Sequence, residues 1–162
     1  MERVRINLRD QQFGISEDND ISGSCHLMHS EYIEWVNTNE LVSNTCVFTD
    51  LCFPDVLKCK PGAIKRKVAW MHEPRSIYCH TYDWIADNNR LFDFVLCYDK
   101  QLLDRGENFL YSPNLSTYIR FYKNEEKTKL CSIFASPKRH ADGHQMRHAV
   151  IAQFKDTYKL DA

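Results

Sequence analysis

Short apolar runs alternate along the chain with polar segments, several of which have helical spacing. The apolar runs are rich in β-branched and aromatic residues, which is typical of strands. We expect strands at residues 4–8, 45–49, 67–72, 92–98, 109–111 and 130–135. The run at 67–72 has an almost continuous apolar centre, which indicates a strand buried on both faces, as in parallel sheets.

Helices are expected between these strands. The predicted helical segments are residues 31–37, 50–58, 78–88, 99–104 and 142–156. Ser30 is a candidate cap for the first segment, and Glu31 and Glu34 lie near its positive end. The last segment has apolar residues at helical spacing, namely Met146, Ala149, Val150 and Phe154.

Alternating strands and helices predict an α/β protein with a Rossmann-like parallel sheet. We expect residues 1–123 to form this sheet with helices on its faces. Residues 124–128 form a charged linker, and residues 129–162 provide the first strand, loop and helix of a second domain. Ligands bind at the carboxyl ends of the strands in such sheets, so the loops after Met71, Tyr98 and Ala135 are the places to look for chemistry.

Composition and charge narrow the class of protein. Hydrophobic residues make up 43% of the chain, and the net charge of -1 lacks the basic excess of proteins that bind nucleic acids or membrane surfaces. No run approaches the about 20 apolar residues of a membrane span, and residues 1–6 have no signal-peptide core. We expect a cytoplasmic protein, of a bacterium or a virus-infected host cell, without a nucleic-acid partner. Its seven cysteines are expected to be reduced thiols.

Glu73 directly follows the expected strand at 67–72. Pro74 biases Glu73 toward extended geometry, and a carboxylate held at a rigid strand end is well placed to act as a general base. Arg75 is a candidate to bind an anionic group or to pair with Glu73. The alternative is a surface turn with a solvated salt bridge.

A basic loop follows the expected strand at 130–135. It contains Ser136, Lys138 and Arg139, while Gly143 opens the next helix and Arg147 lies one turn further on. Backbone N–H groups at a helix start, with basic side chains nearby, suit phosphate binding. A solvated basic turn is the alternative.

Three histidines allow a different chemistry. His140, His144 and His148 recur every four residues, and two histidines at i and i+4 can bind zinc. No HExxH glutamate accompanies them. A small metal-binding protein is therefore an alternative function, while our primary expectation includes no metal and no cofactor.

Several segments resemble, in order, motifs of family 10 glycosyltransferases, the α1,3/4-fucosyltransferases, and are closest to members from phages, large viruses and marine bacteria. The segments are KVAWMHEPRSI at 67–77, FDFVLCYDKQLL at 92–103, FLYSP at 109–113, SIFASPK at 132–138 and GHQMRH at 143–148. The resemblance covers about residues 45–155 and implies a GT-B fold, in which two Rossmann-like domains face each other across a cleft. It also implies inverting transfer of a sugar, typically fucose from GDP-fucose, to a glycan hydroxyl.

The resemblance assigns roles to individual residues. Glu73 matches the carboxylate proposed as the base, and Arg75 and Ser76 lie on the acceptor side. Ser136 and Arg147 match positions near the donor diphosphate.

Lys138 and Arg139 join this expected donor site. Pro137 stands where the family has an asparagine, and the glycine expected after residues 109–113 is not found. The family's later donor-site motif, with its Tyr, Asn, Glu and Lys, has no counterpart.

The expected donor-binding domain is therefore incomplete, and a second polypeptide or self-association would have to complete it. A non-catalytic domain that binds a glycan or a partner is the alternative function.

We expect the 162-residue chain alone to transfer no detectable sugar, because the nucleotide base and ribose have few expected contacts. Incubation of the purified chain with labelled GDP-fucose and a glycan mixture tests this. Robust transfer without a second polypeptide would contradict it.

Overall fold

The computed structural model describes residues 2–11, 32–38, 40–113, 126, 131–155 and 160–161. They belong to two compact units, Met1–Arg120 and Phe121–Ala162, which are described separately. Among the described residues, no helix has the length and apolar character needed to cross a bilayer.

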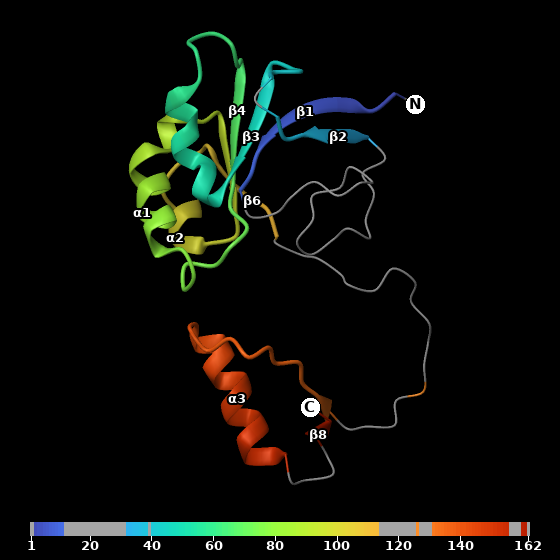
Figure 1. Cartoon of the computed structure of the whole chain (residues 1–162). Coiled ribbons are helices and arrows are strands. Elements are labelled where there is room, and N and C mark those ends of the chain that lie inside the picture. Colours follow the sequence, from blue (N-terminus) through green and yellow to red (C-terminus); the bar gives the residue numbers. More distant parts are fainter. Residues whose placement is uncertain are drawn as a thin grey trace. The chain divides into compact units, whose positions relative to one another are not determined.

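The first unit contains one sheet of six parallel strands in the order β2-β1-β3-β4-β5-β6 (Figure 1). The strands are β1 (Val4–Arg9), β2 (Ile33–Val36), β3 (Thr45–Thr49), β4 (Arg66–Trp70), β5 (Phe94–Cys97) and β6 (Phe109–Tyr111). The predicted α/β class with a Rossmann-like parallel sheet is confirmed. The chain progresses in one direction from β1 to β2 and in the other from β3 to β6, so the topological switch point lies between β1 and β3.

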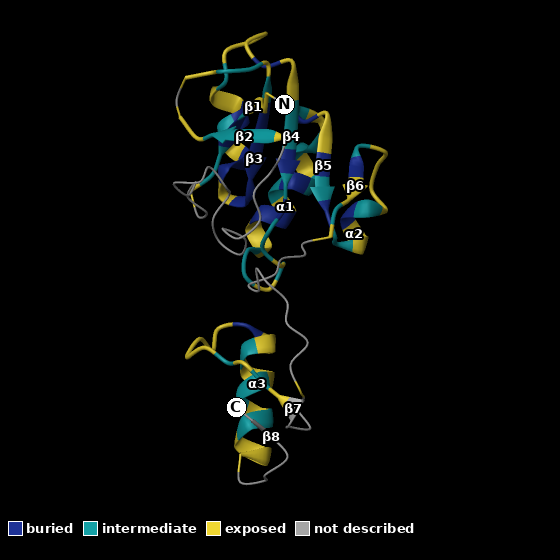
Figure 2. Cartoon of the chain, turned by 90° about the vertical axis from the view of Figure 1, so that its right-hand side faces the viewer, coloured by how far each residue is buried: buried dark blue, intermediate teal, exposed yellow. Residues whose placement is uncertain are grey.

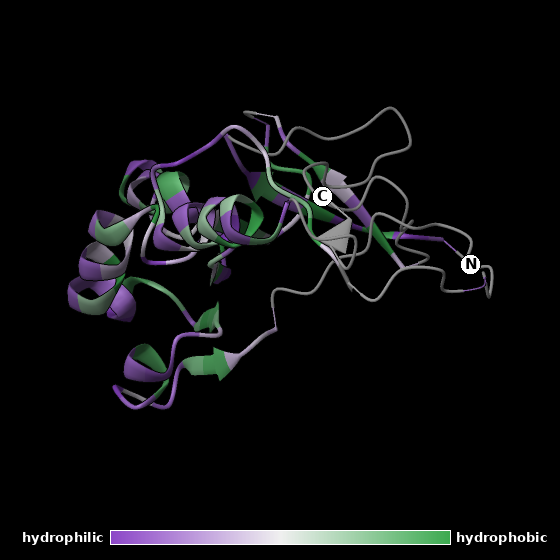
Figure 3. Ribbon diagram, turned by 90° about the horizontal axis from the view of Figure 1, so that it is seen from below, coloured by the Kyte–Doolittle hydropathy of each residue, from purple (hydrophilic) through white to green (hydrophobic). Residues whose placement is uncertain are grey.

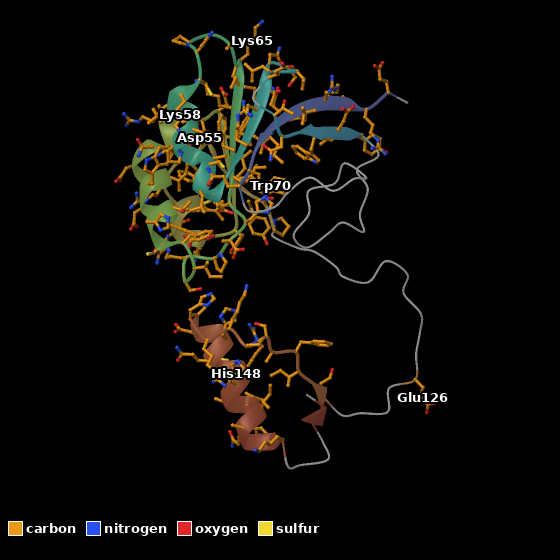
Figure 4. The ribbon with its side chains drawn as sticks, in the orientation of Figure 1. Asp55, Lys58, Lys65, Trp70, Glu126 and His148 are labelled. Atoms are coloured by element: carbon orange, nitrogen blue, oxygen red, sulfur yellow. The ribbon has the colours of Figure 1, made fainter. Side chains whose placement is uncertain are left out.

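Helices connect the strands from β3 onward. These are the 3-10 helix η1 (Asp50–Lys58), α1 (Cys79–Asn88), the 3-10 helix η2 (Asn89–Leu91) and α2 (Lys100–Leu103). The predicted helical turn at 50–58 is thus a 3-10 helix that includes Pro54. Its buried Phe53 and Val56 face the core, while Asp55 and Lys58 form an exposed ion pair at 2.6 Å (Figure 4).

The core lies between the sheet and these helices, where the buried residues gather (Figure 2). Phe92 is its aromatic centre, with ring centroids 5.9 Å from Phe48 and 6.0 Å from Phe53. Trp84 of α1 lies 6.4 Å from Phe92, so aromatic contacts join both helices to β3. The described helices cover one face of the sheet, whereas helices on both faces were expected. On the opposite face Trp70 contacts Trp35, with ring centroids 6.2 Å apart (Figure 4).

Cysteines fill small spaces in this core. Cys46, Cys52 and Cys97 are buried free thiols, and Cys59 and Cys79 are also free. Burial raises the pKa of Cys46 to about 12 and that of Cys52 to about 11, so both are uncharged at neutral pH. They act as small hydrophobic side chains, as the sequence predicts.

Asn7 is a fully buried polar residue in β1. Its side-chain amide donates to the carbonyl oxygens of Ser43 at 2.8 Å and Thr45 at 2.6 Å, and its Oδ1 accepts from the Val42 N–H at 2.8 Å. These bonds satisfy the buried amide and tie the segment before β3 to β1.

The helix predicted at 31–37 is wrong, because residues 33–36 form strand β2. β2 pairs in parallel with β1 from Val4↔Ile33 to Asn7↔Val36, and Arg5 forms an ion pair with Glu34 at 3.0 Å across the two strands. Pairing with the open edge of β1 outweighs the local preference of Glu34 for a helix start. Ser30 and Glu31 lie outside the described residues.

The second unit is a strand–loop–helix–strand segment. It contains β7 (Cys131–Ser132), α3 (Asp142–Phe154) and β8 (Leu160–Asp161), and β7 pairs in parallel with β8. The strand predicted at 130–135 is shorter than expected, and β8 was not predicted. Of the predicted linker at 124–128, only Glu126 lies within the described residues.

The apolar residues of α3 are not buried. Met146 is 67% exposed and Phe154 is 43% exposed, so the expected apolar face is present in the sequence but uncovered in the structure. Hydrophilic and hydrophobic residues alternate along the helices, whereas the central strands are mostly hydrophobic (Figure 3).

We predict that Phe92→Ala lowers the free energy of unfolding by about 3–5 kcal/mol, because it leaves a cavity among the three aromatic rings of Phe48, Phe53 and Trp84. Urea denaturation of the full chain measures this change. Phe94→Ala is the matched control, since Phe94 is 36% exposed and should lose less than half as much. Equal losses would contradict the proposed location of the core.

Candidate functional site

The carboxyl ends of β1, β3, β4 and β5 lie at one edge of the parallel sheet. In the register between β3 and β4, Thr49 lies opposite Trp70. The residues that follow these two strands are therefore neighbours: Asp50 after β3, and Met71, His72 and Glu73 after β4.

Asp50 is the most unusual residue at this edge. It is only 3% exposed, and its backbone has φ = 26°, in the left-handed region that non-glycine residues rarely adopt. Its Oδ1 accepts from the His72 N–H at 3.0 Å and from the Glu73 N–H at 3.5 Å. A buried carboxylate on strained backbone is typical of functional sites.

Two tyrosines hold the same loop through its carbonyl groups. The Tyr82 hydroxyl donates to the Glu73 carbonyl oxygen at 2.8 Å, and the Tyr98 hydroxyl donates to the His72 carbonyl oxygen at 3.4 Å. Side chains from η1, α1 and the end of β5 thus bond the backbone of His72 and Glu73. Glu73 itself is half-buried.

The electrostatics of the edge are set by burial. Burial raises the pKa of Asp50 to about 7, the N–H groups of His72 and Glu73 oppose this shift, and the charges of Glu73 and Asp10 add to it. Burial also lowers the pKa of His72, which keeps its imidazole neutral at physiological pH. The Asp50 carboxyl group therefore changes charge near neutral pH.

A pocket of about 210 Å³ adjoins Asp50, between the first turns of η1 and α1. Its lining is mostly apolar. The lining residues are Asp50, Leu51, Phe53, Pro54, His80, Thr81 and Trp84. Its size and its aromatic wall suit a single ring rather than an extended ligand.

The structure places Arg75 beside Asp99. Its guanidinium bonds the Asp99 carboxylate at 3.2 and 3.4 Å and lies 4.5 Å from the centre of the Tyr82 ring. Asp99 also caps α2 by accepting from the Leu102 N–H at 3.1 Å. Arg75 therefore links the loop after β4 to the end of β5. Ser76 is exposed, in the turn between β4 and α1.

The second unit brings the residues of the basic loop together at the start of α3. His148 bonds through Nε2 to the carbonyl oxygens of Ser136 at 3.0 Å and Lys138 at 3.2 Å. Gln145 donates to the Arg139 carbonyl oxygen at 3.3 Å. Figure 4 shows His148 on α3, below the loop that it holds.

Arg147 lies one turn after Gly143 on α3. A side chain added at Gly143 would meet the Arg147 guanidinium at 3.8 Å, so this cation lies over the first turn of α3. Lys138 and Arg139 are exposed nearby in the sequence. The arrangement concentrates positive charge at the N-terminal end of a helix, where anions are favoured.

The three histidines have roles in this loop. His144 accepts the Ala141 N–H through Nδ1 at 3.3 Å and contacts the His140 ring at 4.7 Å. Desolvation, together with the charges of His140 and Arg147, lowers the pKa of His144. Within the described residues, no group of three or more His, Cys, Asp or Glu side chains is arranged to hold a metal ion.

Glu73 with its neighbours and the basic loop belong to different units. Sequence reasoning found both, but it missed Asp50, Tyr82 and Tyr98. A signal for Asp50 was present, because an acidic residue directly after the buried run at 45–49 lies at the same sheet edge as Glu73.

No protein-family model, curated protein or solved structure matches the chain.

We predict that Asp50→Asn changes how stability depends on pH. The pKa of Asp50 is about 7 in the folded chain against an ordinary 3.8, so the folded state holds a proton that the unfolded state has lost between these values. The wild type therefore loses stability as pH rises from about 4 to 7, by about 4 kcal/mol from this group. Relative to the wild type, Asp50→Asn should gain this amount over the same range.

Urea denaturation between pH 4.5 and 8.5 measures the difference between the two proteins. Asp104→Asn, which removes an exposed carboxylate after α2, is the control and should follow the wild type. A constant difference between Asp50→Asn and the wild type would show that Asp50 is ionised throughout.

Proposed function

We propose that the chain is a glycosyltransferase-like protein of the inverting class, which transfers a sugar, with fucose as the first candidate, from a nucleotide sugar to a glycan hydroxyl only when a second polypeptide or self-association completes its donor site. The observation that carries the proposal is the fixed backbone of Glu73 at the carboxyl ends of the parallel strands, where its N–H donates to Asp50, a residue that lines a ring-sized pocket. The motif resemblance to family 10 glycosyltransferases supplies the reaction class.

Glu73 would act as the base. As the acceptor oxygen attacks the anomeric carbon, its proton passes to the Glu73 carboxylate and a new C–O bond forms. The bond to the nucleoside diphosphate breaks on the opposite face, and the diphosphate leaves with the electron pair. A base held at a fixed position contributes about 10²–10⁴-fold to such a step.

The basic loop would bind the leaving diphosphate. Arg147 provides a guanidinium at the start of α3, and Lys138 and Arg139 provide exposed cations in the same loop. Charge-assisted bonds to phosphate oxygens are among the strongest hydrogen bonds in proteins. Ser136 adds a hydroxyl group, and no metal ion takes part in the proposed step.

A non-catalytic binding domain is the second candidate. It is favoured by the exposure of large apolar side chains in the second unit, where Phe134 is 93% and Met146 is 67% exposed. Such residues favour association with a partner or with a second copy of the chain.

We predict that the full chain binds glycans with a free hydroxyl on a glycan array and binds GDP-fucose weakly in a saturation-transfer NMR titration. Glu73→Gln should keep both interactions, because the variant loses only the proton acceptor. Arg147→Ala should weaken GDP-fucose binding and leave glycan binding unchanged. In a transferase completed by a second polypeptide, Glu73→Gln should lower turnover by about 10²–10⁴-fold.

Lys65→Ala is the matched control for Arg147→Ala, since it removes an exposed cation from the other unit. Glycan binding without any GDP-fucose binding would favour the non-catalytic domain. Near-normal turnover of Glu73→Gln would exclude Glu73 as the base.

A further inference from the structure

We infer that Asp50 is a positioning residue for Glu73: its buried carboxylate binds the two successive peptide N–H groups that direct the Glu73 side chain, and it binds them more tightly when it is ionised. The role of Glu73 as a base rests on the proposed function. The hydrogen bonds from the loop after β4 to Asp50 do not depend on the proposed function, and they can be measured separately.

The hydrogen bonds of β4 explain why the loop needs this carboxylate. The Met71 N–H still donates to the Leu96 carbonyl oxygen at 2.9 Å, as in a sheet. The next two N–H groups, of His72 and Glu73, turn to Asp50. Asp50 thus accepts hydrogen bonds from the first two N–H groups beyond the sheet, where pairing with β5 no longer fixes the backbone.

The backbone of Asp50 supports this interpretation. Non-glycine residues rarely adopt φ = 26°, although aspartate and asparagine tolerate this region better than most residues. The left-handed turn places the Asp50 carboxylate under the loop after β4. Strain at a residue whose side chain makes three hydrogen-bond contacts to that loop indicates that the contacts maintain the conformation.

Neighbouring ionisable groups influence the charge of Asp50. Negative charges on Asp10 and Glu73 oppose its ionisation, while the N–H groups of His72 and Glu73 favour it. Tyr78 and Tyr82 also interact electrostatically with Asp50, and His80 lines the same pocket. Hydrogen bonds to an ionised acceptor are roughly twice as strong as neutral ones. The hydrogen bonds from the His72 and Glu73 N–H groups to Asp50 should therefore become stronger as pH rises through about 7.

Two substitutions distinguish the effect of the hydrogen bonds to Asp50 from the effect of its charge. Asp50→Asn keeps an oxygen acceptor at Oδ1 and tolerates the left-handed backbone, but it does not titrate. Asp50→Ala removes the acceptor and leaves two N–H groups without it. Asp104→Asn changes the same residue type at an exposed position and should alter neither property.

The test follows the backbone amides of the full chain by ¹H–¹⁵N NMR between pH 5 and 9. In the wild type, the His72 and Glu73 amide protons should move downfield together with a midpoint near pH 7, and Asp50→Asn should abolish this step. Asp50→Ala should accelerate hydrogen exchange at both amides by about 10- to 100-fold relative to Asp50→Asn. Should Asp50→Ala fail to fold, the comparison of the wild type with Asp50→Asn still decides.

Persistence of the same titration in Asp50→Asn would overturn the inference, because another group would then cause it. Sugar transfer, where it is found, gives an independent readout: turnover should rise through pH 7 in the wild type and lose this step in Asp50→Asn, with KM unchanged. If the amides titrate but the chain binds neither GDP-fucose nor a glycan, the hydrogen bonding by Asp50 stands and the proposed function is wrong. Sugar transfer by a completed transferase whose His72 and Glu73 amides do not titrate would support the proposed function and overturn the inference about Asp50.

Discussion

The register between β3 and β4 is the constraint on which the carboxyl edge depends. Thr49 lies opposite Trp70, and this pairing brings Asp50 within hydrogen-bond distance of the His72 N–H. A slip of one residue would move every side chain of β4 to the opposite face of the sheet and separate the two loops. The burial of Phe48 and Ala69 in the core prevents such a slip. Core packing therefore fixes the register of β3 and β4, and with it the geometry of the site.

Most of the first unit could be predicted because its strands are buried. The apolar run at 45–49 has one stable location, in the interior of a sheet, and the structure places it there as β3, whereas residues 109–111 form the outermost strand β6, of which only Phe109 is buried. Residues 33–36 were misassigned because Ile33, Glu34 and Trp35 fit a helix or a strand equally well locally. Only the edge of β1, distant in the sequence, decides between them.

The site was only partly predictable for a related reason. Glu73 was found because a strand end and Pro74 are visible in the sequence. Asp50 was missed because its importance depends on a left-handed backbone and on a partner loop that local patterns do not show. The spacing of His144 and His148 indicated a possible metal site, whereas the structure uses both rings to hold the backbone of their own loop.

The position of β1 in the sheet has a consequence for biosynthesis. β1 is made before both of its neighbours, β2 and β3, and its buried Asn7 finds its acceptors at Ser43 and Thr45. One side of β1 can pair with β2 as soon as β2 is made, but its other side and the Asn7 amide reach their partners only when residues 43–48 have been made. From β3 to β6, by contrast, each strand pairs with the one made just before it, so that this part of the sheet can form in the order of synthesis. Until β3 is made, the unpaired side of β1 exposes backbone groups that can pair with another chain.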